Sequence, residues 1–291
     1  MPRTASNTRK IGDTEVSAIG LGGMPMSIEG RPDEARSIAT IHAALEVGIT
    51  LIDTADAYHM TATDVGHNES LIAKALASYG GDTSNVLVAT KGGHLRPGDG
   101  SWIVDGSPAH LREACEASLK RLGVDVIGLY QFHRPDPKTP YEESIGALRD
   151  LLDEGKVRMA GISNATPGQI RQANDILGGR LVSVQNQFSP AFRSSEPELE
   201  LCDELGIAFL PWSPLGGITN AGDLGTKHPA FHQIANELGI SPQKVTLAWM
   251  LAKSPYVIPI PGSSRPETIR DSYTAVNVQL TPEQVAALDA A

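Results

Sequence analysis

The chain has 291 residues, of which 41% are hydrophobic and 20% are charged. This composition is typical of a globular protein with a large core, and it excludes an intrinsically disordered chain. The formal net charge of −10 argues against a nucleic acid or an anionic membrane as a partner, because Lys and Arg are nowhere clustered strongly enough to override it.

The sequence shows no signal for export or for insertion into a membrane. Residues 1–10 lack the apolar segment of a secretory signal peptide, and no run of about 18 apolar residues occurs. Cys115 and Cys202 are far apart and lack Cys-x-x-Cys spacing, as expected for thiols in a reducing compartment. We therefore expect a cytoplasmic protein.

Eight short apolar runs are predicted to be strands. Most of them are too continuously apolar for a sheet with one face in water, which favours a parallel sheet that is buried on both faces. The runs cover residues 16–23, 49–55, 86–93, 126–133, 157–164, 181–188, 207–214 and 257–264.

Amphipathic segments between these runs are predicted to be helices. Ser or Thr followed by Pro is typical of a helix start, and Gly is typical of the position after its end. Three segments follow this scheme: Ser107-Pro108 to Gly123, Thr139-Pro140 to Gly155, and Thr166-Pro167 to Gly178. The alternation predicts an α/β fold, a (β/α)8 TIM barrel that forms one domain over residues 1–291. An open doubly wound sheet is the alternative, but Gly20 and Gly22 are not followed by the third glycine of a dinucleotide fingerprint.

Two segments fall outside this repeat. Residues 9–17 contain Gly12-Asp13 between short strand-like pieces, which predicts an N-terminal β-hairpin that closes the bottom of the barrel. Residues 215–228, after the seventh predicted strand, are long and glycine-rich. Segments of that length in compact domains are usually functional covers or disordered.

Polar side chains gather at the ends of otherwise apolar predicted strands. The C-terminal ends of barrel strands form the active-site face, so these side chains are candidates for a common site. Strand ends are also commonly exposed to solvent, which favours polar residues there. Solvent exposure alone accounts poorly for an Asp, a Lys and a His that each end an apolar strand. The candidates are Asp53, Lys91, His133, Ser163, Asn164, Gln185, Trp212 and Ser213.

The residue types at these ends limit the chemistry. No strand ends in paired histidines, so no metal site is predicted, and Asp53 alone does not supply the two carboxylates of a glycosidase. A Schiff-base aldolase with Lys91 as nucleophile stays open, although it leaves Tyr58 without a role. A Lys beside a Tyr lowers the pKa of the phenol, and an Asp keeps that Lys charged. Such a set suits the reduction of a carbonyl group by hydride from a cofactor.

Seven short motifs follow one another along the chain: LIDTADAY, ATKGG, YQFH, GISN, VQNQF, PWSPLGG and IPGSS. In this order they resemble the aldo-keto reductase superfamily, including its bacterial members of the pyridoxal reductase type, over essentially the whole chain. The resemblance implies an NADP(H)-dependent oxidoreductase that reduces an aldehyde or ketone to an alcohol. It leaves the substrate open among a small aldehyde, a keto-sugar and pyridoxal.

The resemblance also implies roles for individual residues. Tyr58 is implied as the general acid, with Asp53 and Lys91 tuning it and His133 orienting the carbonyl group. Trp212 is implied to stack on the nicotinamide ring, and the segment from Ser213 to cover the pyrophosphate. The positions that match the family's cofactor site are Gly22, Gly23, Met24, Ser163, Asn164, Gln185, Trp212, Ser213, Leu215, Gly217, Ile260, Gly262, Ser263, Arg265 and Asp271.

The adenosine end of the cofactor is expected at the last of these motifs. Ser263 and Ser264 precede Pro266, a good first residue of a helix, so free N–H groups and hydroxyls would face an anion. Arg265 adds a fixed positive charge that suits a phosphate, which favours NADP(H) over NAD(H). Many relatives have Lys where Gly262 stands, so the 2′-phosphate is expected to rest mainly on Arg265.

Substrate contacts are expected from Met24, His94, Trp102 and Arg134, with a salt bridge at the rim as the alternative for Arg134. His59 and His67 are expected to be solvated loop residues, and Asp56 a turn residue. Residues 59–68 make a longer link than is usual in the family, and we expect them to reshape one wall of the substrate pocket.

One alternative belongs to a different class. Potassium-channel β subunits are similar in fold and catalytic residues and use nucleotide occupancy as a signal, so a cofactor-binding regulatory subunit stays open. Otherwise we expect a small-molecule carbonyl substrate as the only partner of a monomer or weak homo-oligomer.

Overall fold

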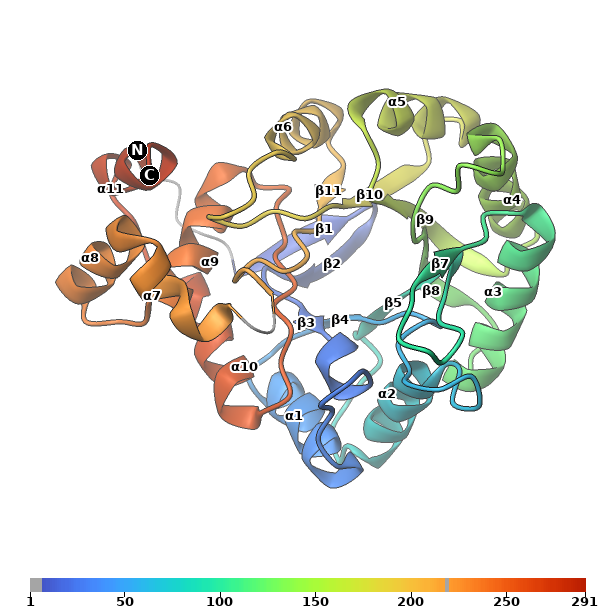
Figure 1. Cartoon of the computed structure of the whole chain (residues 1–291), viewed down its shortest axis with the longest axis horizontal. Helices are drawn as coiled ribbons and strands as arrows, with labels where there is room; N and C mark the ends of the chain where they lie inside the picture. The colour runs from blue at the N-terminus through green and yellow to red at the C-terminus, as the bar shows by residue number, and fades with distance from the viewer. Residues whose placement is uncertain (1–6, 218–219) are drawn as a thin grey trace.

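The computed structural model describes residues 7–217 and 220–291. Seven parallel strands form one sheet in the order β11-β10-β9-β8-β5-β4-β3, which curls into the predicted barrel inside a ring of helices (Figure 1). The bounds are β3 Leu21–Gly22, β4 Leu51–Asp53, β5 Leu87–Gly92, β8 Ile127–Phe132, β9 Val157–Ser163, β10 Leu181–Gln185 and β11 Ala208–Phe209. Two antiparallel hairpins join β1 Thr8–Ile11 to β2 Thr14–Ser17, and β6 His94–Leu95 to β7 Ile103–Val104.

Residues 257–264 close the barrel, but they do not form the regular eighth strand that the sequence predicted. Isolated parallel bridges join this segment to β11 on one side and to β3 on the other. Pro259 and Pro261 accept hydrogen bonds from the N–H groups of Gly20 (3.0 Å) and Gly22 (2.9 Å), but a proline has no N–H to donate in return. The seam beside β3 therefore has only part of a regular ladder.

The N-terminal hairpin β1–β2 lies across the bottom of the barrel, as predicted (Figure 1). Gly12 turns the chain with a φ of +57°, which glycine adopts without strain. Ile11 and Val16 are buried among the apolar side chains that fill the barrel interior. The predicted strand 16–23 is therefore divided between this hairpin and β3.

The helices are α1 Glu34–Glu46, α2 His67–Ser78, α3 Pro108–Leu122, α4 Tyr141–Asp153, α5 Pro167–Ile176, α6 Glu196–Leu205, α7 Leu224–Lys227, α8 Pro229–Leu238, α9 Pro242–Lys253, α10 Pro266–Tyr273 and α11 Pro282–Asp289. Short 3₁₀ turns are η1 Met24–Met26, η2 Ala221–Asp223 and η3 Thr274–Asn277. Helices α7, α8 and α11 lie to one side, outside the ring, and contact α9 (Figure 1). Within the described ranges, no helix is both long and apolar enough to cross a membrane.

Helix starts follow the predicted capping chemistry with one exception. The hydroxyl oxygens of Ser107 and Thr166 cap α3 and α5, as predicted. Helix α4 instead has Pro140 at its N-cap, and the hydroxyl of Thr139 donates to the carboxylate of Asp136 (2.9 Å). That bond ties the start of α4 to the segment that follows β8.

The second hairpin, β6–β7, stands at the C-terminal ends of the barrel strands, where the sequence indicated no regular element. His94 pairs with Val104 and Leu95 with Ile103. Strands of two residues carry too little periodicity to be predicted. The hairpin matters for function because it brings His94 and the neighbouring Trp102 together above the barrel.

Candidate active site

A cavity of about 1260 Å³ lies at the C-terminal ends of the barrel strands. Nearly all residues that the sequence assigned to one site line it, although they come from opposite ends of the chain. Those lining it are Gly22, Met24, Asp53, Tyr58, His94, Trp102, His133, Arg134, Ser163, Asn164, Gln185, Trp212, Ser213, Leu215, Gly217, Ile260, Gly262, Ser263, Arg265 and Asp271. Lining residues that the sequence analysis missed lie outside its motifs, among them Ile28, Ile103, Val104, Lys138 and Gln243. Ile218 and Thr219 of the predicted covering loop lie outside the described residues.

Two of the predicted residues lie behind the cavity wall. Lys91 on β5 is completely buried. Gly23 donates its N–H to the carbonyl of Asp53 (2.8 Å), and a Cβ on Gly23 would lie 2.5 Å from the side-chain oxygen of Asn68. Gly23 thus allows the chain to pass close to the end of β4, and its contact with a cofactor stays a prediction.

Hydrogen bonds join the predicted catalytic residues into one buried chain. The ammonium of Lys91 donates to Asp53 Oδ2 (2.7 Å), to the carbonyl of Thr54 (2.8 Å) and to the phenol oxygen of Tyr58 (3.2 Å). The other carboxylate oxygen of Asp53 accepts a bond from Gln185 Nε2 (2.8 Å). Because the ammonium and the carboxylate are fully bonded, the position of Lys91 beside Tyr58 is fixed from two strands at once.

The charges of this chain follow from burial and from the ion pair. Burial opposes the charged form of Lys91, but Asp53 and Tyr58 together outweigh it, and the pKa of the lysine is raised. Burial also raises the pKa of Tyr58, and the opposing effect of Lys91 does not cancel it. The sequence predicted the contribution of Lys91 correctly but not the larger effect of burial, so the net shift of the Tyr58 pKa is upward.

His133 ends β8 beside the phenol, and its ring lies 5.8 Å from that of Tyr58 in an edge-to-face arrangement. Burial, followed by the charge of Lys91, holds the pKa of His133 well below its usual value. The imidazole is therefore neutral at neutral pH, and its Nδ1 has no hydrogen-bond partner among the described residues. A neutral imidazole can orient a carbonyl oxygen but is not an acid that competes with Tyr58.

Backbone strain is concentrated along the next strand ends. Asn164 (φ +58°) and Ser213 (φ +50°) are the non-glycine residues with positive φ in the described part of the chain, and both line the cavity. The side chain of Asn164 donates to the carbonyl of His133 (3.0 Å) and to the hydroxyl of Ser163 (2.9 Å). The indole N–H of Trp212 is buried without a partner in the described ranges. Strained residues and unpaired polar atoms of this kind are typical of ligand sites.

The far end of the cavity carries the residues expected at the adenosine of a cofactor. The Ser263 hydroxyl accepts the backbone N–H of Arg265 (3.3 Å) just before α10. Asp271 lines the cavity, but Lys244 already holds its carboxylate at 2.8 Å. Arg36 on α1 was not anticipated: its Nε donates to the carbonyl of Ser264 (3.1 Å), which places a second guanidinium beside the segment that carries Arg265.

The family model described as the aldo/keto reductase family matches residues 18–291. The chain belongs to this family. An uncharacterized oxidoreductase of Schizosaccharomyces pombe is 35% identical over 98% of this chain and 89% of its own length.

Solved structures of aldo-keto reductases confirm the barrel. The glycerol dehydrogenase of Gluconobacter oxydans has a TM-score of 0.83 at 29% identity, and an aldo/keto reductase of Klebsiella pneumoniae in complex with NADP and acetate has 0.81 at 28%. Each comparison covers 98% of this chain and 95% of the other. The family identifies the chain as an oxidoreductase of a group that uses nicotinamide cofactors and reduces carbonyl groups.

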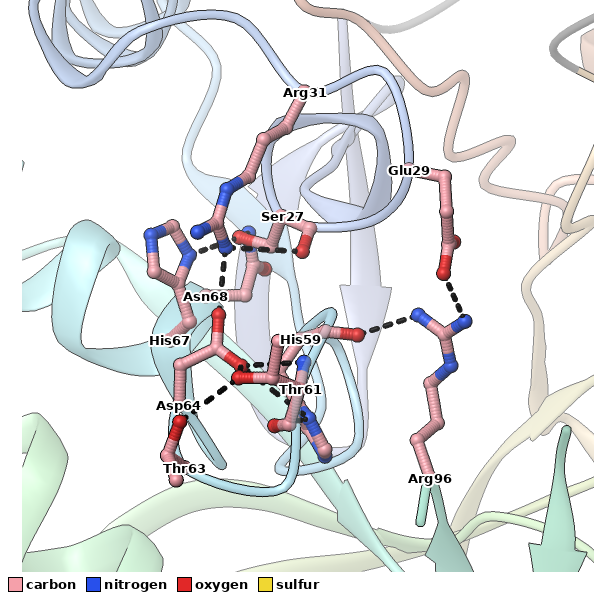
Figure 2. Close-up of polar contacts among 10 residues, drawn as sticks. All are labelled: Ser27, Glu29, Arg31, His59, Thr61, Thr63, Asp64, His67, Asn68 and Arg96. Carbon is pink, nitrogen blue, oxygen red and sulfur yellow. Dashed lines mark hydrogen bonds and ion pairs between the residues drawn. The ribbon is translucent and has the colours of Figure 1, made fainter. Parts of the chain in front are cut away.

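The segment 59–68 is an ordered part of this aldo-keto reductase (Figure 2). Asp64 accepts the backbone N–H of Thr61 (2.7 Å) and pairs with Arg31 at 2.9 Å. His59 is only 2% exposed, and its Nδ1 donates to the carbonyl of Thr61 (2.7 Å). The expectation that His59 is solvated is wrong, because the long segment folds back over it. His67 is half-buried and hydrogen-bonded to Ser27.

No residue of segment 59–68, which lies wholly within the described ranges, lines the cavity. The expectation that this segment reshapes a wall of the pocket is therefore not met by direct contact, and its link to the lining residues runs through Arg96. The Arg96 guanidinium donates to the carbonyl of His59 and to Glu29 (Figure 2), and it lies 4.6 Å from the centre of the Trp102 ring. Segment 59–68 therefore contacts Arg96, and Arg96 in turn contacts the lining residue Trp102.

Asp56 lies in the turn that follows β4, as expected, but it is also 4% exposed. Burial, followed by the charge of Glu69, raises the pKa of Asp56 well above its usual value. One of its oxygens has no partner among the described residues. Burial of this kind favours the neutral form of a carboxyl group.

Proposed function

We propose that the protein is an NADPH-dependent carbonyl reductase that converts an aldehyde or ketone to an alcohol. The observation that supports this most is the buried chain from Asp53 through Lys91 to Tyr58, which lies beside a neutral His133 at the floor of a large cavity. These are the matching catalytic positions of the family, and their charges suit proton donation to an alkoxide.

The chain's own residues divide the work at the reacting carbonyl group. His133 and Tyr58 hold the oxygen atom between them. As negative charge develops on that oxygen, the Tyr58 hydroxyl gives it a proton, and Lys91 stabilises the resulting phenolate. The bound nicotinamide supplies the hydride that forms the new C–H bond. Burial keeps Tyr58 protonated at neutral pH, which is the state that a reductase needs.

The cavity suits NADP(H) in several respects. Asn164 and Ser213 adopt strained backbone conformations along the proposed nicotinamide side, and Trp212 presents an aromatic ring there. Arg265 and Arg36 bring two positive charges to the proposed site of the 2′-phosphate. The related structure from Klebsiella pneumoniae is a complex with NADP.

The hydrogen bonds of Lys91 disfavour the Schiff-base alternative. An amine nucleophile needs a low pKa and a free lone pair. Here three acceptors hold the ammonium, and the pKa of Lys91 is raised. Lys91 therefore suits a fixed charge better than a nucleophile.

Consumption of NADPH over a panel of aldehydes, ketones, keto-sugars and pyridoxal tests the proposal, with Tyr58→Phe as the decisive variant. We expect kcat of Tyr58→Phe to fall by about 100-fold or more, since general acids contribute on that order. Its affinity for NADPH, measured by fluorescence titration, should change little. Tight NADPH binding without turnover of any carbonyl compound would favour the regulatory subunit instead.

A further inference from the structure

Two positively charged side chains on the substrate side of the cavity lack acidic partners. Arg134 and Lys138 lie on the segment between β8 and α4, and both line the cavity. Neither forms an ion pair with any carboxylate within 4.0 Å in the described part of the chain. The chain has a net charge of −10 and does pair exposed cations elsewhere, such as Lys74 with Glu34. Lys10 and Lys120 also form no ion pair in the described ranges, so what distinguishes Arg134 and Lys138 is that both line the cavity.

Asp136 lines the cavity on the same segment as Arg134 and Lys138, and its carboxylate is already occupied. Asp136 accepts bonds from the backbone N–H groups of Gly106 (2.9 Å) and Lys138 (2.9 Å) and from the Thr139 hydroxyl (2.9 Å). Burial opposes its ionisation, but these bonds outweigh burial and lower the pKa of Asp136. Its charge stabilises the local turn, and the Lys138 ammonium stays available.

The positive charge of Arg134 influences the two histidines His94 and His133. After burial, it contributes to lowering the pKa of His94 to about 4 and to lowering that of His133. His94 is therefore neutral at neutral pH, and it supplies a ring but no charge. An anionic group that enters this side of the cavity meets Arg134 and Lys138 as its counter-charges.

Aromatic rings connect these cations to the reaction centre. The ring of His94 lies 4.7 Å from that of His133 and 4.8 Å from that of Trp102. Trp102 is 39% exposed and the adjacent Ile103 is 47% exposed, although both line the cavity. Large apolar side chains left open in a cavity are typical of ligand contacts.

Arg96 holds the Trp102 ring in place. It is 4% exposed, stacks 4.6 Å from the centre of the Trp102 ring, and donates to both His59 and Glu29 (Figure 2). An indole fixed before the ligand arrives loses little entropy on binding. We treat Arg96 as a positioning residue because it acts through Trp102.

We propose that this face of the cavity is a subsite for a flat aromatic aldehyde that carries an anionic group, either a carboxylate or a phosphate. The aromatic ring lies against Trp102, the anion lies at Arg134 and Lys138, and the aldehyde oxygen lies at Tyr58. The inference rests on the proposed carbonyl reductase function and specifies its substrate class.

The test compares aromatic aldehydes with and without a negative charge. With the full chain and NADPH, 4-carboxybenzaldehyde is compared with methyl 4-formylbenzoate, and 4-formylphenyl phosphate with 4-methoxybenzaldehyde. We expect kcat/KM to be about tenfold higher for each anion than for its neutral partner, because hydrogen bonds to charged groups are strong. The preference should shrink as ionic strength rises. The larger preference of the two pairs identifies the anion.

Variants assign the preference to its residues. Arg134→Gln and Lys138→Gln should each remove most of it by raising KM for the anion far more than KM for the neutral ester. Lys120→Gln, an exposed lysine on α3 outside the cavity, is the matched control and should change neither substrate. Equal kcat/KM for acid and ester in the unchanged protein would overturn the inference but leave the reductase function intact. The absence of turnover with every aldehyde would overturn the reductase function itself.

The aromatic part has its own test. Trp102→Ala should raise KM for 4-carboxybenzaldehyde by about tenfold and raise KM for propanal far less, while Trp102→Phe should restore most of the loss. Arg96→Gln should raise the same KM, and the double variant should be no worse than Trp102→Ala, because the two residues act as one unit. Additive losses, or equal losses with propanal, would show that Trp102 and Arg96 serve only the fold.

Discussion

The floor and the outer wall of the cavity are built in contrasting ways. At the floor, Asp53, Lys91 and Gln185 lie on barrel strands, are almost completely buried, and hold one another by short hydrogen bonds. On the wall, Trp102 and Arg134 lie on connecting segments, are exposed, and make contacts through rings and unpaired charge. Under the proposed function, proton transfer relies on the rigid sheet, and substrate selection is left to segments whose length and sequence can vary.

Removal of the Lys91 charge at the floor of the cavity should have the largest effect on activity. Lys91→Met removes the cation that stabilises the Tyr58 phenolate, so we expect kcat to fall by at least about 100-fold with every aldehyde. Wall variants should change KM for some aldehydes only. Steady-state kinetics on an aromatic and an aliphatic aldehyde measure both effects, and a Lys91→Met enzyme that keeps a tenth of its activity would remove the distinction.

The floor should also dominate stability. Asp53→Asn leaves the Lys91 ammonium buried without its counter-ion, and we expect the free energy of unfolding to fall by about 3 kcal/mol. Glu34→Gln breaks the exposed ion pair with Lys74 and is the matched control, with a change of at most about 0.5 kcal/mol.

Chemical denaturation measures the free energy of unfolding of Asp53→Asn and of Glu34→Gln. The double variant Asp53→Asn with Lys91→Met, which removes both charges together, should be more stable than Asp53→Asn alone. A similar cost for Asp53→Asn and Glu34→Gln would mean that the buried ion pair adds nothing to the rigidity of the floor.

A smaller effect is expected at the adenosine end. Arg265→Ala should raise KM for NADPH by about tenfold and leave KM for NADH nearly unchanged, because the guanidinium is expected to contact the 2′-phosphate alone. Arg36→Ala should repeat the pattern more weakly. Arg171→Ala, an exposed arginine on α5 outside the cavity, is the control. An unchanged preference for NADPH in both cavity variants would contradict the assignment.

The kcat for reduction should hardly change with pH near neutrality. The pKa of Tyr58 is raised by burial, so the proton donor stays protonated as pH increases, and the pKa of His133 is lowered, so the imidazole stays neutral as pH decreases. We expect kcat for reduction to be flat from about pH 6 to about pH 9. A step near pH 6.5 that disappears in His133→Gln would show that the histidine titrates and donates the proton.

The sequence was sufficient to predict the barrel and the convergence of the site. Strand ends such as Asp53, Lys91 and His133 follow buried runs, and parallel strands bring their C-terminal ends to one face whatever the details between them. Ser163, Asn164 and Gln185, which the resemblance assigns to the cofactor site, follow the same rule and line the cavity.

The connecting segments were harder to predict because their structure depends on contacts remote in sequence. His59 is buried through contacts with Thr61 and Arg96, and the two-residue strands of β6–β7 have no measurable period. The eighth strand was predicted from its short apolar run, although Pro259 and Pro261 in the same run lack the N–H groups that a regular strand needs. The upward shift of the Tyr58 pKa was not predicted, because the burial of a side chain cannot be derived from the spacing of residues in the sequence.

The proline-containing seam has a consequence for the motions of the barrel. Where Pro259 and Pro261 leave the ladder against β3 incomplete, local opening should require less free energy than at the fully paired β8–β9 boundary. Gly22 on one side of this seam and Gly262 on the other both line the cavity. A dinucleotide bound there would bridge the two sides of this seam and oppose its local opening. Amide hydrogen exchange at Gly20 and Gly22 should therefore slow more on binding than exchange in β8.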